Sequence, residues 1–446
     1  MMERFLKKLM EEAKTAGIEA CEAYIVERDS FGATVTGGEV AEYKSNTTRG
    51  LGFRGTRNGK MGYSSTEAFD DEAIRQLITG VLESAELCED PDPVFFYSGN
   101  EPVPELDLCS EELQGISPEE KIECAKKLEN VIKAYDNRIA KAERNVISTG
   151  RHTIRIVNSN GMDRSFTEDM CVMYGMAVAK EDQAVSTGFY GDGGRSFAKL
   201  DAEKIGREVG RRAIFGLNAS QITSGKYRVV FTNEAMADLL QTFCGIISAE
   251  NAQKGLSLLK GKLGEKVASD CVTLIDDPLL LEGLDARPFD AEGVPSKAHT
   301  VIENGVFKTF LHNLKTAYKD GVETTGNASK AGYNGTVHVA PSNLYLKPGQ
   351  RSLEEMLVSI GNGLVITDVS GLHAGANAVS GDFSLLSKGY TFRNGKLDQM
   401  VEQITVAGNF YDLLKQIQEL SSQLVFPLGG IGAPDVDAGE LAISGC

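Results

Sequence analysis

The sequence predicts an α+β protein with two small N-terminal helix–antiparallel-sheet modules, followed by a larger β-rich C-terminal domain with covering helices. Three observations support this class. A helix pattern, several strand patterns and a second helix pattern follow one another near the N-terminus, and the same order returns after an acidic, proline-rich linker. Beyond residue 225, glycine-rich strand patterns dominate. We place the first module at 1–90, the linker at 91–117, the second module at 118–220 and the C-terminal domain at 225–446.

The first module opens with an amphipathic helix over residues 2–16, because its apolar residues recur at helical spacing up to Gly17. Short strand patterns fill residues 21–65, with turns at the Gly-Gly and Asn-Gly pairs, and a helix is expected over 71–89. The linker that follows carries four prolines between Asp90 and Ser117, which is typical of a segment without regular structure.

The second module repeats this order, with a helix over 118–136, strands over 139–190 and a helix over 202–218. The repetition is consistent with a weak internal duplication. It is equally consistent with the pattern that any chain of alternating helices and strands would give.

In the C-terminal domain, a strand over 227–232 runs into a helix expected from about 233 to 252. Asn-Gly pairs at 304–305 and 394–395 predict two hairpins. Further helices are expected over 353–360 and 410–420.

Charge and composition exclude several classes of protein. Lys and Arg number 46 against 63 Asp and Glu, which gives a formal charge of -17, so direct binding to a nucleic-acid phosphate backbone is not expected. The eight cysteines form no CxxC pair, which favours reduced thiols in a cytoplasmic protein. No run approaches the roughly 18 apolar residues of a membrane span, so no membrane association is expected.

The histidines are too scattered for a local zinc-binding pair. A hydrolytic zinc site needs about three protein ligands and an open position for water, and a frequent donor pair is two imidazoles on one helix. No two of the five histidines stand within one helical turn: they are His152, His299, His312, His338 and His373.

Six motifs of the C-terminal domain, taken in their order and spacing, resemble the TldD/PmbA family, also known as DNA gyrase modulators. They are Pro288-Phe-Asp-Ala-Glu-Gly293, Ile302-Glu-Asn-Gly305, Thr324-Thr-Gly-Asn327, Ser380-Gly-Asp-Phe-Ser384, Val406-Ala-Gly-Asn409 and Gly432-Ala-Pro434. The resemblance covers the whole chain, since the family has two small N-terminal α/β regions before a β-rich domain.

The family contains two kinds of subunit, and the resemblance implies the kind without a metal site. The TldD kind resembles a zinc peptidase with an HExxxH helix and a later cysteine ligand, whereas the PmbA kind, also called TldE, lacks them. Here Asn233 and Asp238 stand at the two histidine positions, and Glu234 alone matches. Residues 410–440 contain no cysteine, and Cys446 is the last residue. An Asn carbonyl is a poor zinc donor, and a lone carboxylate prefers harder cations.

The resemblance therefore implies a non-catalytic subunit of a heteromeric zinc metallopeptidase that acts on cytosolic peptides. It implies no catalytic residue and no cofactor in this chain, with zinc in a TldD-like, HExxxH-bearing partner. Small and hydrogen-bonding residues of two motifs suit a lining against which an extended peptide pairs through its backbone, although glycines there also permit tight turns. These residues are Thr325, Gly326, Asn327, Ser380, Gly381, Asp382, Phe383 and Ser384.

Other interpretations stay open at this point. Glu234 and Asp238 could converge on Mg²⁺ or Ca²⁺, or form a solvated helix face. The alternatives to a peptidase subunit are a stand-alone peptide-binding or regulatory protein, and a metal-independent hydrolase. The isolated chain could also form a homodimer. The hydrolase would use one of three sets of residues: Asp290 with Glu292, Asp382 with Ser384, or Cys244. Backbone capping would explain Asp290 and Asp382 equally well, and the apolar neighbours of Cys244 indicate an inert thiol.

Overall fold

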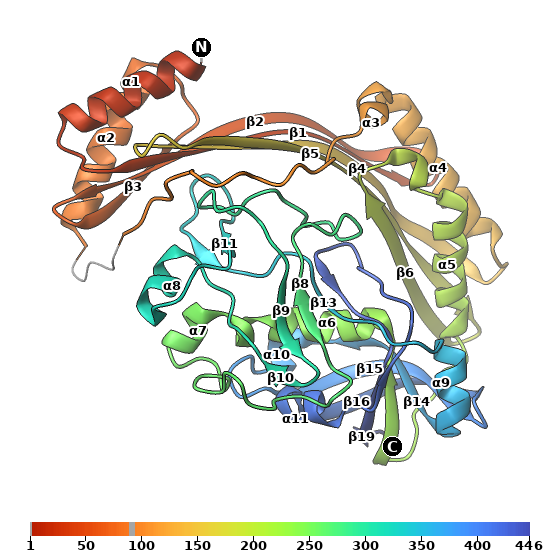
Figure 1. Ribbon diagram of the computed structural model, residues 1–446. Helices are drawn as coiled ribbons and strands as arrows, with labels where there is room; N and C mark the ends of the chain where they lie inside the picture. Colours follow the sequence, from red (N-terminus) through yellow and green to blue (C-terminus); the bar gives the residue numbers. More distant parts are fainter. Residues whose placement is uncertain (1, 89–93) are drawn as a thin grey trace.

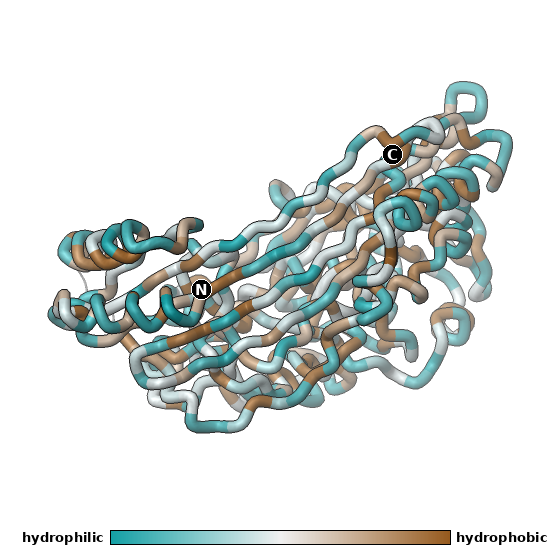
Figure 2. The backbone as a smooth tube through the Cα atoms, turned by 90° about the horizontal axis from the view of Figure 1, so that it is seen from above, coloured by the Kyte–Doolittle hydropathy of each residue, from teal (hydrophilic) through white to brown (hydrophobic). Residues whose placement is uncertain are grey.

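The structure is a computed structural model and describes residues 2–88 and 94–446 (Figure 1). Its N-terminal half is one long sheet in which neighbouring strands are antiparallel, in the order β3-β2-β1-β4-β5-β6. Seen from above, the strands run side by side along the length of the molecule (Figure 2). The strands are β1 (Cys21–Thr36), β2 (Glu39–Arg57), β3 (Lys60–Thr66), β4 (Ile139–Asn158), β5 (Asp163–Glu181) and β6 (Ala184–Gly194).

Two pairs of helices pack at opposite ends of this sheet, each over its own apolar core (Figure 1). Three of the four begin at a residue whose side chain accepts a backbone N–H of the first turn, namely Asp70, Ser117 and Asp201. The pairs are α1 (Met2–Thr15) with α2 (Asp71–Glu86), and α4 (Pro118–Ala134) with α5 (Ala202–Phe215); the short helix α3 spans Glu111–Gly115.

The C-terminal half contains a six-stranded sheet in the order β16-β15-β14-β7-β19-β17 and a five-stranded sheet in the order β10-β9-β8-β13-β18. Helix α6 (Asn233–Phe243) contacts β7 and β14 of the first sheet and β18 of the second, so it lies between them in the largest apolar core. The strands of the first sheet are β7 (Gly225–Phe231), β14 (Asn362–Ser370), β15 (Asp382–Arg393), β16 (Lys396–Asn409), β17 (Glu419–Leu420) and β19 (Val436–Ser444).

The second sheet is built from short strands, and small helices and turns fill the connections. Its strands are β8 (Leu274–Asp276), β9 (His299–Glu303), β10 (Val306–Phe307), β13 (Leu344–Leu346) and β18 (Ile431–Gly432), and a two-stranded ladder joins β11 (Ala328–Ser329) to β12 (His338–Val339). The remaining helices are η1 (Phe197–Lys199), η2 (Cys244–Ile247), α7 (Ala249–Gln253), α8 (Leu314–Asp320), α9 (Leu353–Ile360), α10 (Leu372–Gly375) and α11 (Phe410–Gln416).

A buried junction joins the long sheet to the C-terminal domain. Arg54 of β2 donates from Nε to Glu22 of β1 at 2.8 Å, and its Nη1 lies 3.7 Å from Glu292 of the C-terminal domain. Beside them, the rings of Phe166 and Phe289 pack edge to face at 5.1 Å. The two halves therefore share an interior and not only a connecting segment.

The predicted class, mixed α+β with a β-rich C-terminal part, is confirmed. Five predicted helices, at 2–16, 71–89, 118–136, 202–218 and 353–360, form within a few residues of their expected ends. Residue 89, at the end of the second of these, and residues 91–93 of the predicted linker lie outside the described residues.

Three local predictions differ from the structure. The short strands expected over 21–55 merge into the long β1 and β2, because polar residues that resembled turns are exposed positions within continuous strands, whereas the strand expected over 60–65 forms as β3. The helix expected over 233–252 breaks after Phe243, and α7 restarts after Ser248, whose side chain caps it. The helix expected over 410–420 ends at Gln416.

Nothing in the sequence patterns indicates that the two N-terminal modules share one sheet. The sheet is continuous because β1 pairs with both β2 and β4. No helix in the described residues is long and apolar enough to cross a membrane.

Candidate functional site at the start of helix α6

Helix α6 begins where strand β7 ends, and the carboxylate of Asp435, which directly precedes β19, satisfies its first free N–H. Thr232 precedes the helix in an extended conformation and makes no side-chain cap. The N–H of Asn233 instead donates to Asp435 Oδ1 at 3.0 Å, and Ser421 Oγ donates to the second oxygen of Asp435 at 2.8 Å. Asn233 Oδ1 accepts the N–H of Glu234 at 2.8 Å. The Asn233 side chain is thus used locally at the helix start.

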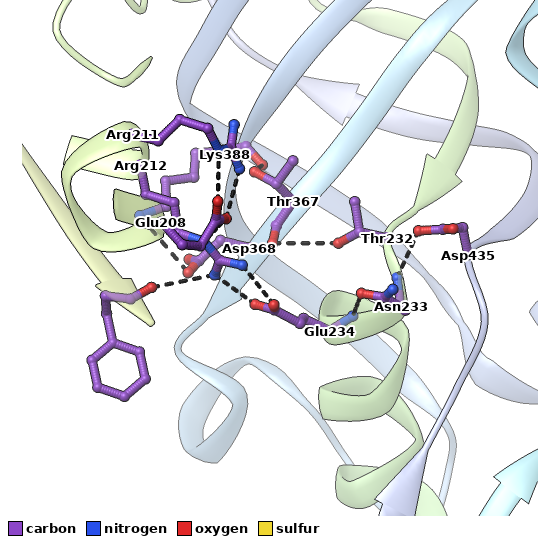
Figure 3. Close-up of polar contacts among 11 residues, drawn as sticks. Glu208, Arg211, Arg212, Thr232, Asn233, Glu234, Thr367, Asp368, Lys388 and Asp435 are labelled. Atoms are coloured by element: carbon purple, nitrogen blue, oxygen red, sulfur yellow. Dashed lines mark hydrogen bonds and ion pairs between the residues drawn. The ribbon is translucent and has the colours of Figure 1, made fainter. Parts of the chain in front are cut away.

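Glu234 is held by an arginine from the other half of the chain (Figure 3). Both of its carboxylate oxygens accept from Arg212 of α5, each at 2.6 Å. Arg212 also donates to Glu208 at 2.7 Å and to the Phe189 carbonyl at 3.2 Å, and lies over the Tyr190 ring. Burial disfavours its charge, but the bonds to the two glutamates outweigh burial and raise the pKa of Arg212. A carboxylate bound at both oxygens is poorly placed to act as a general base.

Asp238 lies one turn further along α6 and is exposed. Desolvation, with smaller contributions from Asp368 and Glu234, raises its pKa to about 6. Asp368 is itself 3.8 Å from Lys388 on the neighbouring strand (Figure 3). Asp238 therefore lies beside two other carboxylates, of which Glu234 pairs with Arg212 and Asp368 with Lys388.

These residues do not fit a zinc ion. Asn233 offers an amide, Glu234 is engaged by Arg212, and Asp238 is a lone carboxylate, whereas catalytic zinc needs about three nitrogen, sulfur or carboxylate ligands. Within residues 2–88 and 94–446, no three His, Cys, Asp or Glu side chains gather as a metal-binding group. The same observation gives no support to a Mg²⁺ or Ca²⁺ site on Glu234 and Asp238.

Thr325, Gly326 and Asn327 lie in a buried polar network. The N–H of His312 donates to Thr325 Oγ1 at 2.6 Å, Thr325 Oγ1 donates to Asn327 Oδ1 at 2.7 Å, and Asn327 Nδ2 donates to Asp276 at 2.6 Å. Gly326 has a φ of 71°, a conformation that glycine adopts without strain. Because Thr325 and Asn327 are buried, their side chains shape the β-domain from inside.

The segment from Ser380 to Ser384 lies at the surface, at the start of β15. Ser380 Oγ and Asn409 Nδ2 each donate to the carboxylate of Asp382 at 2.8 Å, and these two bonds lower the pKa of Asp382. The two predicted groups of lining residues thus make their hydrogen bonds in separate networks. The other residues of the segment are Gly381, with a φ of 84°, Phe383, which is buried, and Ser384, which is exposed.

The groups considered for metal-independent hydrolysis have structural contacts. Asp290 and Glu292 are buried at the junction between the halves: Asp290 accepts the N–H groups of Glu292 and Val294, and burial raises the pKa of both carboxyls. Burial also raises the pKa of the Cys244 thiol to about 11, so the reactive thiolate is scarce near neutral pH.

Arg212 and Asp435 complete the site and were missed in the sequence analysis. Arg212 stands on a predicted helix four residues after Glu208, which indicates a local ion pair and nothing more. Its partner Glu234 comes 22 residues later on another element. Asp435 is 202 residues from Asn233, and no local pattern connects them.

Comparison with known proteins gives three consecutive domain matches. Residues 21–85 match the PmbA/TldA metallopeptidase domain 1, residues 111–215 its central domain and residues 224–445 its C-terminal domain. The metalloprotease PmbA of Escherichia coli O157:H7 is 26% identical over 430 residues, covering 94% of this chain and 92% of that protein. A metalloprotease of Methanothermobacter thermautotrophicus is 29% identical over 409 residues, covering 89% and 86%.

Two solved structures share the fold. A Thermotoga maritima protein, whose name proposes a modulator of DNA gyrase, is 34% identical with a TM-score of 0.92 and 100% coverage of both chains. TldE from Thermococcus kodakarensis is 23% identical with a TM-score of 0.90, covering 99% of this chain and 100% of that one. The family resemblance found in the sequence motifs is confirmed.

Proposed function

This chain belongs to the PmbA/TldD metallopeptidase family, and we propose that it is the non-catalytic, PmbA/TldE-like subunit of a heteromeric cytosolic zinc peptidase. The observation that carries the proposal is the state of Glu234. It is the one residue that matches the HExxxH pattern, and Arg212 binds both of its oxygens at 2.6 Å. In place of a metal-bound water, this glutamate has an arginine from α5 as its partner.

The residues at the two histidine positions support the same proposal. The Asn233 amide oxygen accepts the neighbouring Glu234 N–H, and Asp238 is an exposed carboxylate that, within the described residues, belongs to no group of three possible metal ligands. The strand-to-helix geometry of a peptidase motif is kept while its donor atoms are replaced. We therefore place the zinc of the assembly in a TldD-like partner that carries HExxxH, and expect none in this chain.

For the substrate, we propose an extended peptide that lies against the surface of the C-terminal domain around Ser380–Ser384. Asp382 and Ser384 of this segment are exposed at the start of β15, and hydrogen bonds from Ser380 and Asn409 fix the Asp382 carboxylate. Thr325 and Asn327 support the same domain from inside through their buried network. The exposed Asp382 and Ser384 side chains can hydrogen-bond peptide backbone groups, which would let the assembly accept many peptide sequences.

Reconstitution tests this function. The purified chain, a purified HExxxH-bearing relative and their mixture are compared for cleavage of an unstructured peptide, and the zinc content of each sample is measured after dialysis. The mixture should cleave, this chain should not, and zinc should follow the partner. Removal of the zinc by a chelator should abolish all cleavage by the mixture.

Two results would reject the proposal. One is cleavage by this chain alone in the presence of chelator, which would favour a metal-independent hydrolase. The other is about one zinc per chain that is lost on the substitution Glu234→Gln or Asp238→Asn, which would mean that the segment binds metal after all.

A further inference from the structure

The loop that follows α7, residues 254–266, exposes three leucines. Leu256, Leu258 and Leu263 have exposed fractions of 42%, 51% and 55%, although they come from one thirteen-residue segment. Single exposed apolar side chains are ordinary on a protein surface, whereas a group of them marks a site of interaction. In Figure 1 this loop runs below α7, at the side of the molecule away from α9.

The loop is held in place by its other residues, so the leucines are displayed by a fixed backbone. Ser257 Oγ donates to the Ile246 carbonyl at 2.6 Å, and Leu259, between the exposed leucines, is 1% exposed. The N–H of Leu258 donates to the Tyr411 hydroxyl at 3.2 Å. A fixed backbone lowers the ordering entropy lost when a partner binds.

The charge of the loop is opposite to that of the chain. It contains four lysines and one glutamate, while the whole chain has a formal charge of -17. Lys254 pairs with Glu250 and Lys266 with Asp270. Within the described part of the chain, Lys260 and Lys262 form no ion pair. Two lysines beside exposed leucines suit a partner face with apolar residues inside an acidic rim.

The loop adjoins the proposed peptide lining. The Tyr411 hydroxyl that accepts the N–H of Leu258 also donates to the Val379 carbonyl at 3.4 Å. Val379 is 38% exposed and directly precedes Ser380. A chain bound to the loop would therefore sit next to Ser380–Ser384, where a zinc-bearing subunit has to reach the peptide.

We propose that loop 254–266, together with Val379, is the surface on which the zinc-bearing subunit docks, through an apolar face bordered by acidic residues. This inference rests on the proposed function and deepens it by locating the contact. The same surface on a second copy would oppose lysine to lysine, whereas an anionic membrane would be attracted by the same two lysines and is distinguished from the subunit by experiment. Those two occupants are outcomes of the test.

The test compares two pairs of exposed apolar residues. The first variant is Leu256→Ser with Leu258→Ser. The matched control is Val358→Ser with Leu397→Ser, because these residues are 66% and 51% exposed. They also lie near each other, since Val358 packs against Gly395, two residues before Leu397. All variants should keep the thermal unfolding temperature of the parent chain, because the substituted side chains are exposed. The dissociation constant for the HExxxH-bearing relative and the peptidase activity at saturating chain are then measured.

We expect the loop variant to raise the dissociation constant by about tenfold or more, and the control variant to change it by less than about twofold. Activity at saturation should stay near the parent value, since the loop contributes binding and no chemistry. The further variant Lys260→Glu with Lys262→Glu should weaken binding and flatten its dependence on salt.

The outcomes separate this inference from the proposed function. If the complexes are active and both loop variants have the dissociation constant of the parent chain, the docking surface is wrong, but the proposed function is not affected. Absence of any complex between the parent chain and the relative would reject both. The loop would be assigned to a membrane if the chain sediments with anionic vesicles and the leucine variant does not, while binding to the relative is unchanged. It would be assigned to a second copy if self-association of the chain is lost in the leucine variant under the same condition.

Discussion

Two arginine–glutamate contacts hold the N-terminal sheet and its helices to the C-terminal domain, and they differ in burial. At the first junction, Arg54 lies 3.7 Å from Glu292 of the C-terminal domain, with side-chain exposures of 6% and 5%, and it also bonds Glu22 of its own sheet, whose side chain is 0% exposed. At the second, Arg212 bonds Glu234 with exposures of 28% and 29%. Both junctions pair a guanidinium with a carboxylate, but the groups around Arg54 are almost fully shielded from water, whereas Arg212 and Glu234 remain partly solvated.

The comparison shows why acidic residues at motif positions need not form a catalytic site. Glu292 was a candidate for hydrolytic chemistry and Glu234 matches the glutamate of HExxxH, and both face an arginine from the other half of the chain. A carboxylate in such a position links elements that are far apart in sequence. Because desolvation makes a broken buried pair much more damaging than a broken partly exposed one, the two junctions should respond differently to the same substitution.

The largest effect should follow Arg54→Met, which leaves Glu22 buried without its counter-charge. We expect it to lower the free energy of unfolding by about 3–5 kcal/mol, measured by urea unfolding. The control is Arg75→Met, whose partner is Glu72 and whose side chain is 62% exposed; it should change stability by less than about 1 kcal/mol.

The double variant Arg54→Met with Glu22→Leu sharpens this test. Removing both charges eliminates the unpaired Glu22 carboxylate, so the double variant should be more stable than Arg54→Met alone, while the loss of Arg54 beside Glu292 is common to both variants. Equal losses at Arg54 and Arg75 would mean that burial does not distinguish the junctions.

A smaller effect is expected at the second junction. Arg212→Met should lower stability by roughly 1–2 kcal/mol, because two charge-assisted bonds to Glu234 are lost at a partly solvated site. A double-mutant cycle with Glu234→Gln should give a favourable coupling of about 1 kcal/mol. The cycle is measured on the chain alone, without partner or metal. A coupling near zero would show that the contact adds nothing to stability and would remove the assigned role of Glu234.

Local structure could be predicted from the sequence, whereas the contacts at the two junctions could not. Helix starts at Asp70, Ser117 and Asp201 follow from capping chemistry that acts within a few residues. The family motifs likewise placed Asn233, Glu234 and Asp238 at the start of a helix, and that placement is confirmed.

The contacts across the molecule could not be predicted in this way. The partnership of Arg212 with Glu234 depends on how α5 packs beside α6, and that of Arg54 with Glu292 joins residues 238 positions apart. The single long sheet was missed for the same reason, since the pairing of β1 with β4 depends on tertiary structure. Periodicity and composition describe one segment at a time, and neither carries the register between distant segments.

The smallest effect should come from Asp238, beside the second junction. Its pKa in the folded chain is raised to about 6, compared with about 3.9 in an unfolded chain. The folded state therefore binds this proton more tightly, and the resulting stability is complete below about pH 4 and is lost as the pH rises through about 6. Asp238→Asn removes the titration, so it should match the parent near pH 4 and exceed it above pH 7. Because Asp238 is exposed, solvent screening should keep the gain below about 1 kcal/mol.

The control for this pH dependence is Asp382, whose pKa is lowered by its bonds to Asn409 and Ser380. Its contribution has the opposite sign: it is present above the unfolded pKa and is lost as the pH falls through the folded one. Asp382→Asn should therefore destabilise the chain at neutral pH and lose that effect in acid. Urea unfolding from pH 4 to 8 measures both variants. If both curves shift in the same direction, desolvation and the neighbouring carboxylates do not raise the pKa of Asp238 in the folded chain, and the difference between the Asp238 and Asp382 environments is wrong.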